Sequence, residues 1–463
     1  MRSSSNNTGR LTKHLAQELQ SLVYPRKEDK DRLEECFLYA NIERAHVLML
    51  LECGLAKEEL VRNHLLQLEV LESEQFSSLL SEKTPRGFYM TWERYLQTDE
   101  KSCFAHLGRS RNDINATLAR LRLRKSIVEL LQAGISIVTD CINIGHQYSD
   151  LPMAGHTHWQ PAMPLSLGHQ FYAWGFAIVR ELFGILYALN ESEEECPMGA
   201  GAQGGTNLKI NPEYTAFLLG FDGCTHNSLD AVANRSFALH MLAAVSGLAL
   251  IVNRICQDIL FYTSLEVGYF SLSDDLCGSS SMMPQKRNPF LCEIVSAKML
   301  TITGIWNTVL TMLRGTPYTN TAVAGEAMEE IFFALQKTNT GLGIFLALIN
   351  GIIPNVVRMN EVAKDYYTCA TMLANDLVTN SNFSFREAHR VVGEWISDAE
   401  KSNRSLVVVA CNECKKNDIR FDPDILSPEF AVRFAEYGGG PGPSSLKKQK
   451  EKLETKCINI QVL

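Results

Sequence analysis

The sequence predicts an all-α protein built around a bundle of long helices. Three observations predict this fold class. Apolar residues recur at helical spacing in nearly every long segment, strand-like alternation is rare, and clusters of Gly and Pro interrupt the helices at 152–164, 196–205 and 271–289. A chain of 463 residues is too long for one simple core, so we expect two or three domains.

Capping signals and apolar periodicity place the individual helices. One helix should begin near Asp29 and end near Cys53, because Gly54 is a typical C-terminal cap. The longest should run from Asn112 to about Tyr148, roughly 50 Å, and cannot bury its own apolar face. Its candidate neighbours in the bundle are 165–189, 230–264, 289–314 and 324–353, and the helices shorten after 354.

Composition limits the partners and the compartment. The net charge of -8 argues against nucleic acid as a partner. The most apolar stretch, 237–252, is shorter than the roughly 20 residues that span a membrane, so we expect no membrane partner. Thirteen scattered cysteines without a secretory signal favour the reduced cytoplasm, and the isolated pair Cys411 and Cys414 is not expected to bind metal.

Four polar segments carry candidate chemistry, and the first is 106–113, just before the longest helix. A helix N-terminus attracts anions. Arg111 can bind a carboxylate there with two N–H groups, and Ser110 and Asn112 add shorter donors. The alternative is that Ser110 or Asn112 simply caps the helix.

The second segment, 156–161, contains histidines, and the third segment, 227–235, ends in Arg235. The role of each of these residues depends on the group that it contacts. Residues 156–161 read His-Thr-His-Trp-Gln-Pro, and a histidine can transfer protons near neutral pH, although a structural histidine is the alternative. Arg235 should lie two turns into an otherwise apolar helix. A buried guanidinium needs an anion, which would be an internal carboxylate or the substrate.

The fourth segment, 278–289, reads Gly-Ser-Ser-Ser-Met-Met-Pro-Gln-Lys-Arg-Asn-Pro. Asn288 and Pro289 form a helix-start signal, so the loop is mobile at one end and fixed at the other, as a closing loop requires. Glu293, one turn into the following helix, should face inward and orient an imidazole. An ordinary polar loop and a surface glutamate are the alternatives.

Together these blocks resemble the argininosuccinate lyase branch of the fumarase/aspartase superfamily. HxGRSRND, THxQ, LGFDGxTxNSLDAV and SSxMPQKxNP occur in the expected order, and a Gly-Gly-x-x-Pro stretch follows, over roughly residues 9–450. The resemblance implies three helical domains, 1–109, 110–354 and 355–463, with the long-helix bundle in the second. It also implies a homotetramer with a core of about twenty helices, in which three subunits build each site.

The resemblance implies a carbon–nitrogen lyase that eliminates fumarate from an N-substituted L-aspartate, or adds an amine to fumarate, without metal or cofactor. The anti β-elimination passes through an aci-carboxylate. Ser280, six residues before Lys286, matches the serine that removes the proton, and Lys286 stabilises the intermediate. His158 matches a proton-transfer residue paired with Glu293. The implied substrate-binding residues are Ser110, Arg111, Asn112, Thr157, Gln160, Arg235, Ser281, Met283 and Asn288.

The amine end departs from the family pattern. In argininosuccinate lyases a YNxDxQEDK segment holds the arginine, and in the corresponding residues 317–328 only Glu326 survives. Losing groups that hydrogen-bond one leaving group weakens discrimination by orders of magnitude. We therefore expect an amine other than arginine, such as a diamine or another amino acid. Argininosuccinate lyase proper and a catalytically silent structural homologue are the alternatives. The altered amine-end positions are Tyr89, Asn320, Gly325 and Met328.

Overall fold

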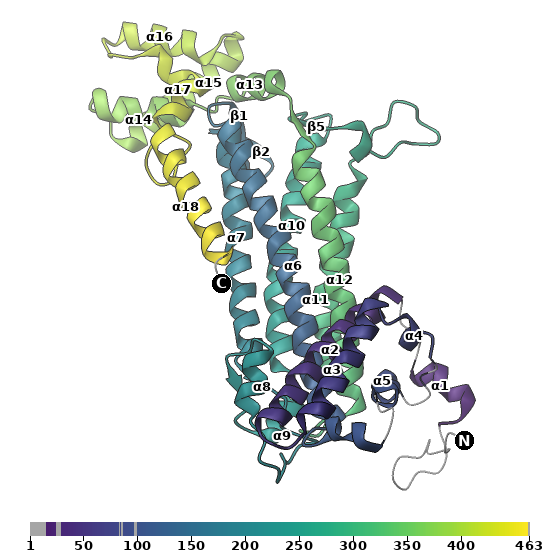
Figure 1. The fold of residues 1–463 in the computed structure, drawn as a ribbon. Coiled ribbons are helices and arrows are strands. Elements are labelled where there is room, and N and C mark those ends of the chain that lie inside the picture. Colours follow the sequence, from purple (N-terminus) through teal and green to yellow (C-terminus); the bar gives the residue numbers. More distant parts are fainter. Residues whose placement is uncertain (1–14, 25–28, 83, 85–86, 97–99, 462–463) are drawn as a thin grey trace. The chain divides into compact units, whose positions relative to one another are not determined.

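The computed structural model describes residues 15–24, 29–82, 84, 87–96 and 100–461 (Figure 1). Helices dominate these residues and the strands form only two-stranded sheets, which confirms the all-α class. The chain divides into two compact units. Unit 1 comprises Met1–Val128, Tyr187–Leu242 and Ile305–Phe333, and unit 2 comprises Glu129–Leu186, Ala243–Gly304 and Ala334–Leu463. The boundaries of the three domains expected from the sequence stay predictions.

Five long helices contribute residues to both units. They are α6 (Arg111–Gln147), α7 (Leu167–Glu193), α10 (Ser236–Thr263), α11 (Phe290–Leu313) and α12 (Ala322–Asn350). Each lies within a few residues of a segment predicted for the bundle, except at the start of α10. Helical periodicity is therefore enough to locate the bundle helices.

The N-terminal part of unit 1 packs around aromatic rings. Tyr39 on α2 (Asp29–Glu52) and Trp92 on α5 (Phe88–Leu96) are buried, with ring centroids 5.5 Å apart. Gly54, with φ +68°, follows α2 as predicted, because a left-handed residue ends the helix without Cβ strain. The elements are α1 (Gln17–Val23), α2 (Asp29–Glu52), α3 (Glu58–Ser73), α4 (Ser77–Leu80), α5 (Phe88–Leu96) and η1 (Glu100–His106).

The predicted helix over 230–264 is wrong at its start, because the chain forms two helices, α9 (Ser228–Ala233) and α10. Asn234 leaves the helical conformation with ψ 132°, and its Oδ1 accepts the Ser236 N–H at 2.7 Å. A side chain that caps the next helix in this way stops the preceding one. Unit 1 also contains α8 (Pro212–Leu218) and the parallel pair β3 (Glu195–Cys196) and β4 (Gly223–Cys224).

Unit 2 adds two antiparallel strand pairs and the short helices that follow Pro354. The pairs are β1 (Pro152–Thr157) with β2 (Gln160–Ser166), and β5 (Phe270–Leu272) with β6 (Ile352–Pro354). The remaining elements are η2 (Asp274–Leu276), α13 (Val356–Asp365), α14 (Ala370–Asn380), α15 (Phe385–Ser402), α16 (Leu406–Lys416), η3 (Pro423–Leu426), α17 (Pro428–Phe434) and α18 (Pro443–Gln461).

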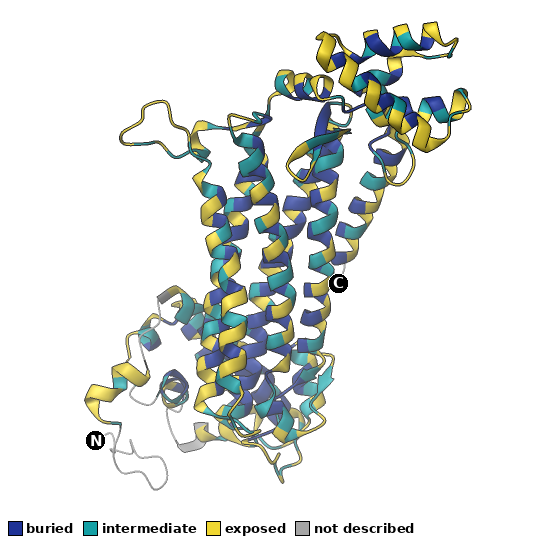
Figure 2. Ribbon diagram, turned by 180° about the vertical axis from the view of Figure 1, so that it is seen from behind, coloured by how far each residue is buried: buried dark blue, intermediate teal, exposed yellow. Residues whose placement is uncertain are grey.

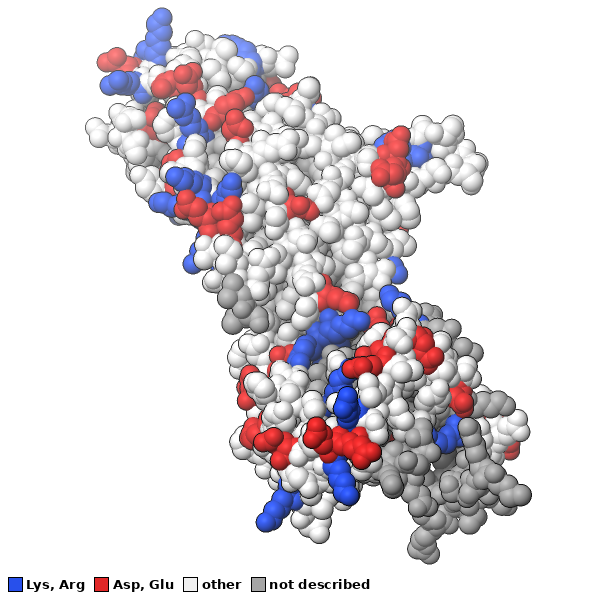
Figure 3. Space-filling model, viewed as in Figure 1, with Lys and Arg blue, Asp and Glu red and all other residues white. Residues whose placement is uncertain are grey.

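The long helices carry many residues that one chain leaves exposed (Figure 2), and several of these residues are large and apolar. Charged side chains are sparse over these helices on the face in Figure 3. Leu250 on α10 is 53% exposed and Phe333 on α12 is 49% exposed. By length and composition α6, α7, α10 and α12 could each cross a membrane, and 44–56% of each apolar window is buried inside the protein. Exposed apolar surface of this kind usually marks a contact with another molecule. The absence of a membrane partner stays a prediction.

Candidate active site

A capping box begins α6 and connects it to the glycine-rich loop 199–205. Asp113 is fully buried, and its carboxylate accepts N–H groups from Ser110 at 2.8 Å, Gly199 at 3.3 Å and Gly201 at 2.9 Å. Burial raises the pKa of Asp113 to about 6, and the N–H donors oppose that shift. The site prediction omits Asp113, although Ser-x-x-Asp before an apolar helix is the sequence signal of such a box.

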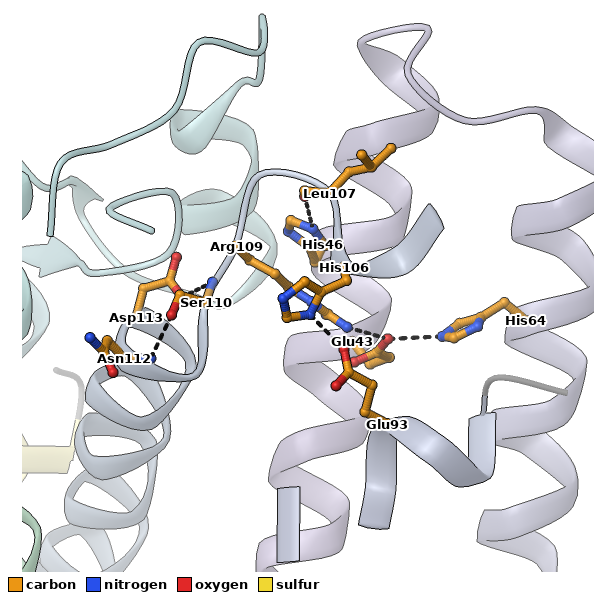
Figure 4. Close-up of polar contacts among 10 residues, drawn as sticks. All are labelled: Glu43, His46, His64, Glu93, His106, Leu107, Arg109, Ser110, Asn112 and Asp113. Carbon is orange, nitrogen blue, oxygen red and sulfur yellow. Dashed lines mark hydrogen bonds and ion pairs between the residues drawn. The ribbon is translucent and has the colours of Figure 1, made fainter. Parts of the chain in front are cut away.

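Buried polar contacts hold the loop before α6 (Figure 4). The Arg109 guanidinium donates to Glu43 Oε1 at 2.8 Å, and His64 Nε2 lies 3.0 Å from the same oxygen. Burial disfavours ionisation of Glu43, but Arg109 and the hydrogen bond from His64 hold its pKa below the usual range. His46 Nε2 lies 2.9 Å from the Leu107 carbonyl. The residues that follow, Ser110 to Asn112, thus start from a fixed backbone.

Asn112 joins two of the predicted functional segments of unit 1. Its Nδ2 donates to the Ala202 carbonyl at 2.8 Å, and its Oδ1 accepts from Asn320 Nδ2 at 2.9 Å. Thr319 Oγ1 donates to Gln203 Oε1 at 2.9 Å beside it. Asn320 therefore lies against the segment predicted to bind a carboxylate, and its amide orients Asn112.

The other predicted amine-end positions of unit 1 divide by burial. Tyr89 and Met328 are interior, 5% and 4% exposed, and the Tyr89 hydroxyl has no hydrogen-bond partner among the described residues. Gly325 lies in the exposed first turn of α12, with no atom within 4 Å of the position a Cβ would take. Gly325 and Asn320 are therefore the two that reach the surface of this chain.

Arg235 lies at the break between α9 and α10 instead of two turns inside a helix. It is 8% exposed, and its Nη1 donates to the carbonyls of Val232 at 3.2 Å and Asn234 at 2.7 Å. Among the described residues it has no ion pair, and its Nε has no hydrogen-bond partner. Of the two partners expected for Arg235, the internal carboxylate is thus not found in the described part of the chain.

In unit 2, His158 occupies the turn of a β-hairpin that the sequence does not reveal. Thr157 pairs with Gln160, so His158 and Trp159 form a two-residue turn, with φ 53° and 64°. Such turns prefer Asn and Gly, and other residues there store strain that often accompanies function. Trp159 is 71% exposed and its ring packs against Phe261 at 5.3 Å. The turn presents the His158 side chain to solvent.

The loop of residues 278–289 is closed at its base and open at its tip. The N–H of Gly278 donates to the Asn288 carbonyl at 2.8 Å, and the Asn288 N–H donates back at 2.9 Å. Helix α11 begins at Phe290, two residues after the predicted cap. Arg287 anchors the loop by donating to the Leu272 carbonyl at 2.8 Å and by an ion pair with Asp274.

Ser280 differs from its neighbouring serines in its hydrogen bonds. Its Oγ accepts the N–H of Met283 at 3.0 Å and the N–H of Met282 at 3.3 Å. N–H donors aimed at a hydroxyl oxygen stabilise negative charge on it. Lys286 is exposed on the same loop and has no ion pair among the described residues. The loop thus supplies donors to Ser280 and a free ammonium group.

The prediction that Glu293 faces inward is wrong in this chain. Glu293 is exposed, whereas Cys292 and Val295 are fully buried and form the inward face of α11. Each helical residue is rotated by about 100° from the one before it, so the position after Cys292 points away from the core. In the first turn of a helix too few residues precede Glu293 for apolar periodicity to show which side of the helix faces the core.

The predicted site residues fall in both units. Unit 1 holds the predicted fumarate-end set and the altered amine-end positions, and unit 2 holds the hairpin and the loop. The unit 2 residues are Thr157, His158, Gln160, Ser280, Ser281, Met283, Lys286, Asn288 and Glu293. Among the described residues no group of three or more His, Cys, Asp or Glu side chains is placed to hold a metal ion.

Comparisons with known proteins identify the family of this chain. The lyase family matches residues 73–304, and the argininosuccinate lyase C-terminal family matches residues 367–433. The argininosuccinate lyase of Anoxybacillus flavithermus is 32% identical over 466 residues, covering 96% of this chain and 98% of that protein. The argininosuccinate lyase of Methanocaldococcus jannaschii is 29% identical over 448 residues, covering 95% of this chain and 92% of that protein.

Solved structures show the same fold. An EDDS lyase in complex with formate has a TM-score of 0.79 at 24% identity, covering 97% of this chain and 92% of that one. A class II fumarase from Schistosoma mansoni has a TM-score of 0.72 at 16% identity, covering 86% and 90%. With the family matches, these likenesses show that the chain is a carbon–nitrogen lyase of the lyase family, in the argininosuccinate lyase branch of the fumarase/aspartase superfamily.

Proposed function

We propose that this protein eliminates fumarate from an N-substituted L-aspartate whose amine is not arginine, or adds that amine to fumarate. The observation that carries the proposal is the Ser280 hydroxyl, whose oxygen accepts two backbone N–H groups on a loop that also bears Lys286. These donors lower the free energy of a Ser280 alkoxide, which a weakly acidic C–H bond requires as base.

The reaction divides among the unit 2 residues. Ser280 Oγ removes the proton from the carbon next to one carboxylate, and the electron pair moves into that group as an aci-carboxylate. Lys286 and the loop N–H groups stabilise the added negative charge. Collapse of this intermediate breaks the carbon–nitrogen bond, and His158 donates the proton that the departing amine takes up.

The unit 1 residues bind the two carboxylates of the fumarate end. Ser110, Arg111 and Asn112 lie at the start of α6, where N–H groups and the helix dipole favour an anion. Arg111 is exposed and has no ion pair among the described residues, and Arg235 is buried without one. Unpaired guanidinium groups are what a dicarboxylate needs.

The amine end supports a leaving group smaller or less polar than arginine. Asn320 is engaged by Asn112, Gly325 has no side chain, and Met328 and Tyr89 are interior. Arginine would therefore find few partners there. The second candidate is argininosuccinate lyase proper, favoured by the relatives of that name that match over nearly the whole chain.

Assembly follows from the exposed apolar faces of the long helices. We propose a homotetramer, because copies of the same helices would cover the faces that one chain leaves open. A cytoplasmic location fits the cysteine chemistry, since none of the thirteen cysteines forms a disulfide. The expected partners are then fumarate and an amine or amino acid, and we expect the protein to bind neither nucleic acid nor a membrane.

The test follows absorbance near 240 nm, where fumarate absorbs. Purified protein is mixed with fumarate and a panel of diamines, simple amines and amino acids, and separately with argininosuccinate. Loss of fumarate with one amine supports the proposal and names the substrate. Release of fumarate from argininosuccinate at a kcat/KM of about 10⁴ M⁻¹s⁻¹ or more would make it an ordinary argininosuccinate lyase.

A further inference from the structure

The turn that presents His158 has a backbone conformation that its residues do not favour. His158 and Trp159 have φ values of 53° and 64°, in the left-handed region where a residue with a Cβ is strained. Neither residue is the glycine or asparagine that such a turn prefers. A strained turn persists only where its surroundings fix it, so contacts outside the turn must hold this one.

The strand ladder behind the turn gives it little support. The register of β1 and β2 shifts between Ala154 and His156, which interrupts the ladder. His156 lies opposite Pro161, which has no N–H group to donate. The side chains of His158 and Trp159 are both exposed, so neither is held by burial. Backbone pairing alone therefore holds the position of His158 only weakly.

One ring on α10 contacts the hairpin on both sides of His158. The centroid of the Phe261 ring lies 5.1 Å from that of His156 and 5.3 Å from that of Trp159. The interplanar angles are 84° and 69°, so both contacts are edge-to-face, an arrangement that aromatic rings favour. Phe261 thus connects the residue two positions before His158 with the residue directly after it.

A second aromatic residue fixes the first strand of the hairpin. The Tyr269 ring lies 5.6 Å from the His156 ring, and Tyr269 is fully buried. Its hydroxyl donates to the Ala154 carbonyl at 3.4 Å. Burial lowers the pKa of His156, so its imidazole is neutral at pH 7 and packs as an aromatic ring. The contact between Phe261 and Trp159 then extends this fixed arrangement to the tip of the hairpin.

We propose that Phe261 is a positioning residue for His158, the proton donor of the proposed reaction. Its ring holds His156 and Trp159 in one arrangement, and the left-handed turn then keeps the imidazole in place for the departing nitrogen. Every residue of this contact belongs to unit 2. The inference rests on the proposed function for the role of His158, whereas the effect of Phe261 on the turn is tested without substrate.

The first test measures amide hydrogen exchange of residues 152–166 in the ligand-free protein. Phe261→Leu keeps an apolar side chain but removes the ring, and we expect the hairpin amides to exchange about tenfold faster. Phe261→Tyr keeps the ring and should stay within about threefold of wild type. Phe171→Leu is the matched control, because Phe171 is fully buried on α7 and packs on Trp174 at 4.9 Å. Its loss should lower the melting temperature and leave hairpin exchange unchanged.

The second test measures kcat and KM, with fumarate and the amine that the absorbance panel identifies or with argininosuccinate. Phe261→Leu should lower kcat about tenfold and leave KM within about twofold, because the proton donor is misplaced while the binding groups are not. In the His158→Ala background the same substitution should cause no further loss, since its effect passes through His158. A merely structural role would lower kcat by the same factor in both backgrounds.

Unchanged hairpin exchange in a folded Phe261→Leu protein overturns the proposal, as does a loss of kcat that adds in full to that of His158→Ala. If Phe261→Leu does not fold, Trp159→Leu removes the same contact from the exposed side and should reproduce both effects. Faster hairpin exchange without turnover of any substrate keeps the role of Phe261 in the turn and removes the proposed reaction. Turnover that Phe261→Leu leaves unchanged, with unchanged exchange, removes the positioning role and keeps the reaction.

Discussion

At the scale of single residues, hydrogen-bond donors distinguish Ser280 from Ser279 and Ser281. Two N–H groups point at the Ser280 oxygen. Ser280→Ala should lower kcat for fumarate formation about a thousandfold, because the base is lost, and leave the melting temperature unchanged. Ser279→Ala is the matched control and should stay within about twofold of wild type. Equal losses in the two variants would remove Ser280 from the role of base.

The contribution of Glu43 to the free energy of unfolding depends on pH. Its pKa in the folded protein lies below the usual 4.5, so its contribution is complete above that pH and is lost as the pH falls below it. Glu43→Gln should lower the free energy of unfolding at pH 7 by about 3–5 kcal/mol, because Arg109 is left buried and unpaired. Urea unfolding at pH 7 and at lower pH measures both effects.

The difference between wild type and Glu43→Gln should shrink steadily below pH 4.5. Glu72→Gln serves as the control. Its partner Arg44 is 30% exposed at the side chain, so we expect less than about 1 kcal/mol at either pH. A Glu43 effect that is independent of pH would show that packing, and not charge, holds the carboxylate.

At the scale of elements, the tether of the 278–289 loop should matter more to turnover than to stability. Arg287→Ala removes the bonds to Asp274 and to the Leu272 carbonyl. The loop would sample more positions, and kcat should fall about tenfold or more because reacting groups are misplaced. The melting temperature should change little, since the pair is exposed.

Limited proteolysis reports the loop directly, and cleavage within 278–289 should be faster in Arg287→Ala. Arg390→Ala is the control, because Arg390 pairs with Glu394 at 2.5 Å on the exposed face of α15, which holds none of the predicted site residues. Unchanged proteolysis together with a lower kcat would mean that Arg287 acts on the substrate and not on the loop.

Sequence patterns locate the helices better than the short elements. Apolar spacing finds α6, α7, α11 and α12 to within a few residues, since burial of one face dictates it. Sequence patterns do not predict the hairpin at His158, because its turn lacks the expected glycine and its second strand contains Pro161 and Pro164. The local signals there contradict the structure that tertiary packing selects.

The order of the sequence motifs predicts Ser280, Lys286 and His158 as site residues, and their roles stay predictions. The orientations of predicted side chains are where the structure differs from the sequence-based expectation. Glu293 is assigned the wrong face, and Arg235 the wrong element, because a short capping side chain at Asn234 redirects the chain. The sequence motif alone does not determine how a helix is rotated about its axis, and therefore which of its side chains face the core.

At the scale of the whole molecule, assembly should depend on the apolar faces of the long helices. Leu250→Glu places a charge on α10 at a position 53% exposed in one chain, and we expect the proposed tetramer to dissociate because a buried unpaired charge is costly. Light scattering after gel filtration measures the mass. Turnover should fall with the mass if three subunits build each site.

Leu265→Glu is the matched control, since Leu265 is 97% exposed beyond the end of α10. Its mass and activity should equal those of wild type. A monomer with full activity after Leu250→Glu would contradict a shared site, whereas an intact tetramer would move the interface to other helices.

The two hydrogen bonds between Gly278 and Asn288 have a consequence for how this protein can diverge. They close the segment between them into a ring, so the helix that follows keeps its position when the number of residues between Gly278 and the anchored Arg287 changes. An inserted or deleted residue there would leave α11 in register and would shift Ser280 relative to Lys286. Loop length is therefore a parameter that evolution, or an engineer, can vary to retune chemistry without rebuilding the scaffold.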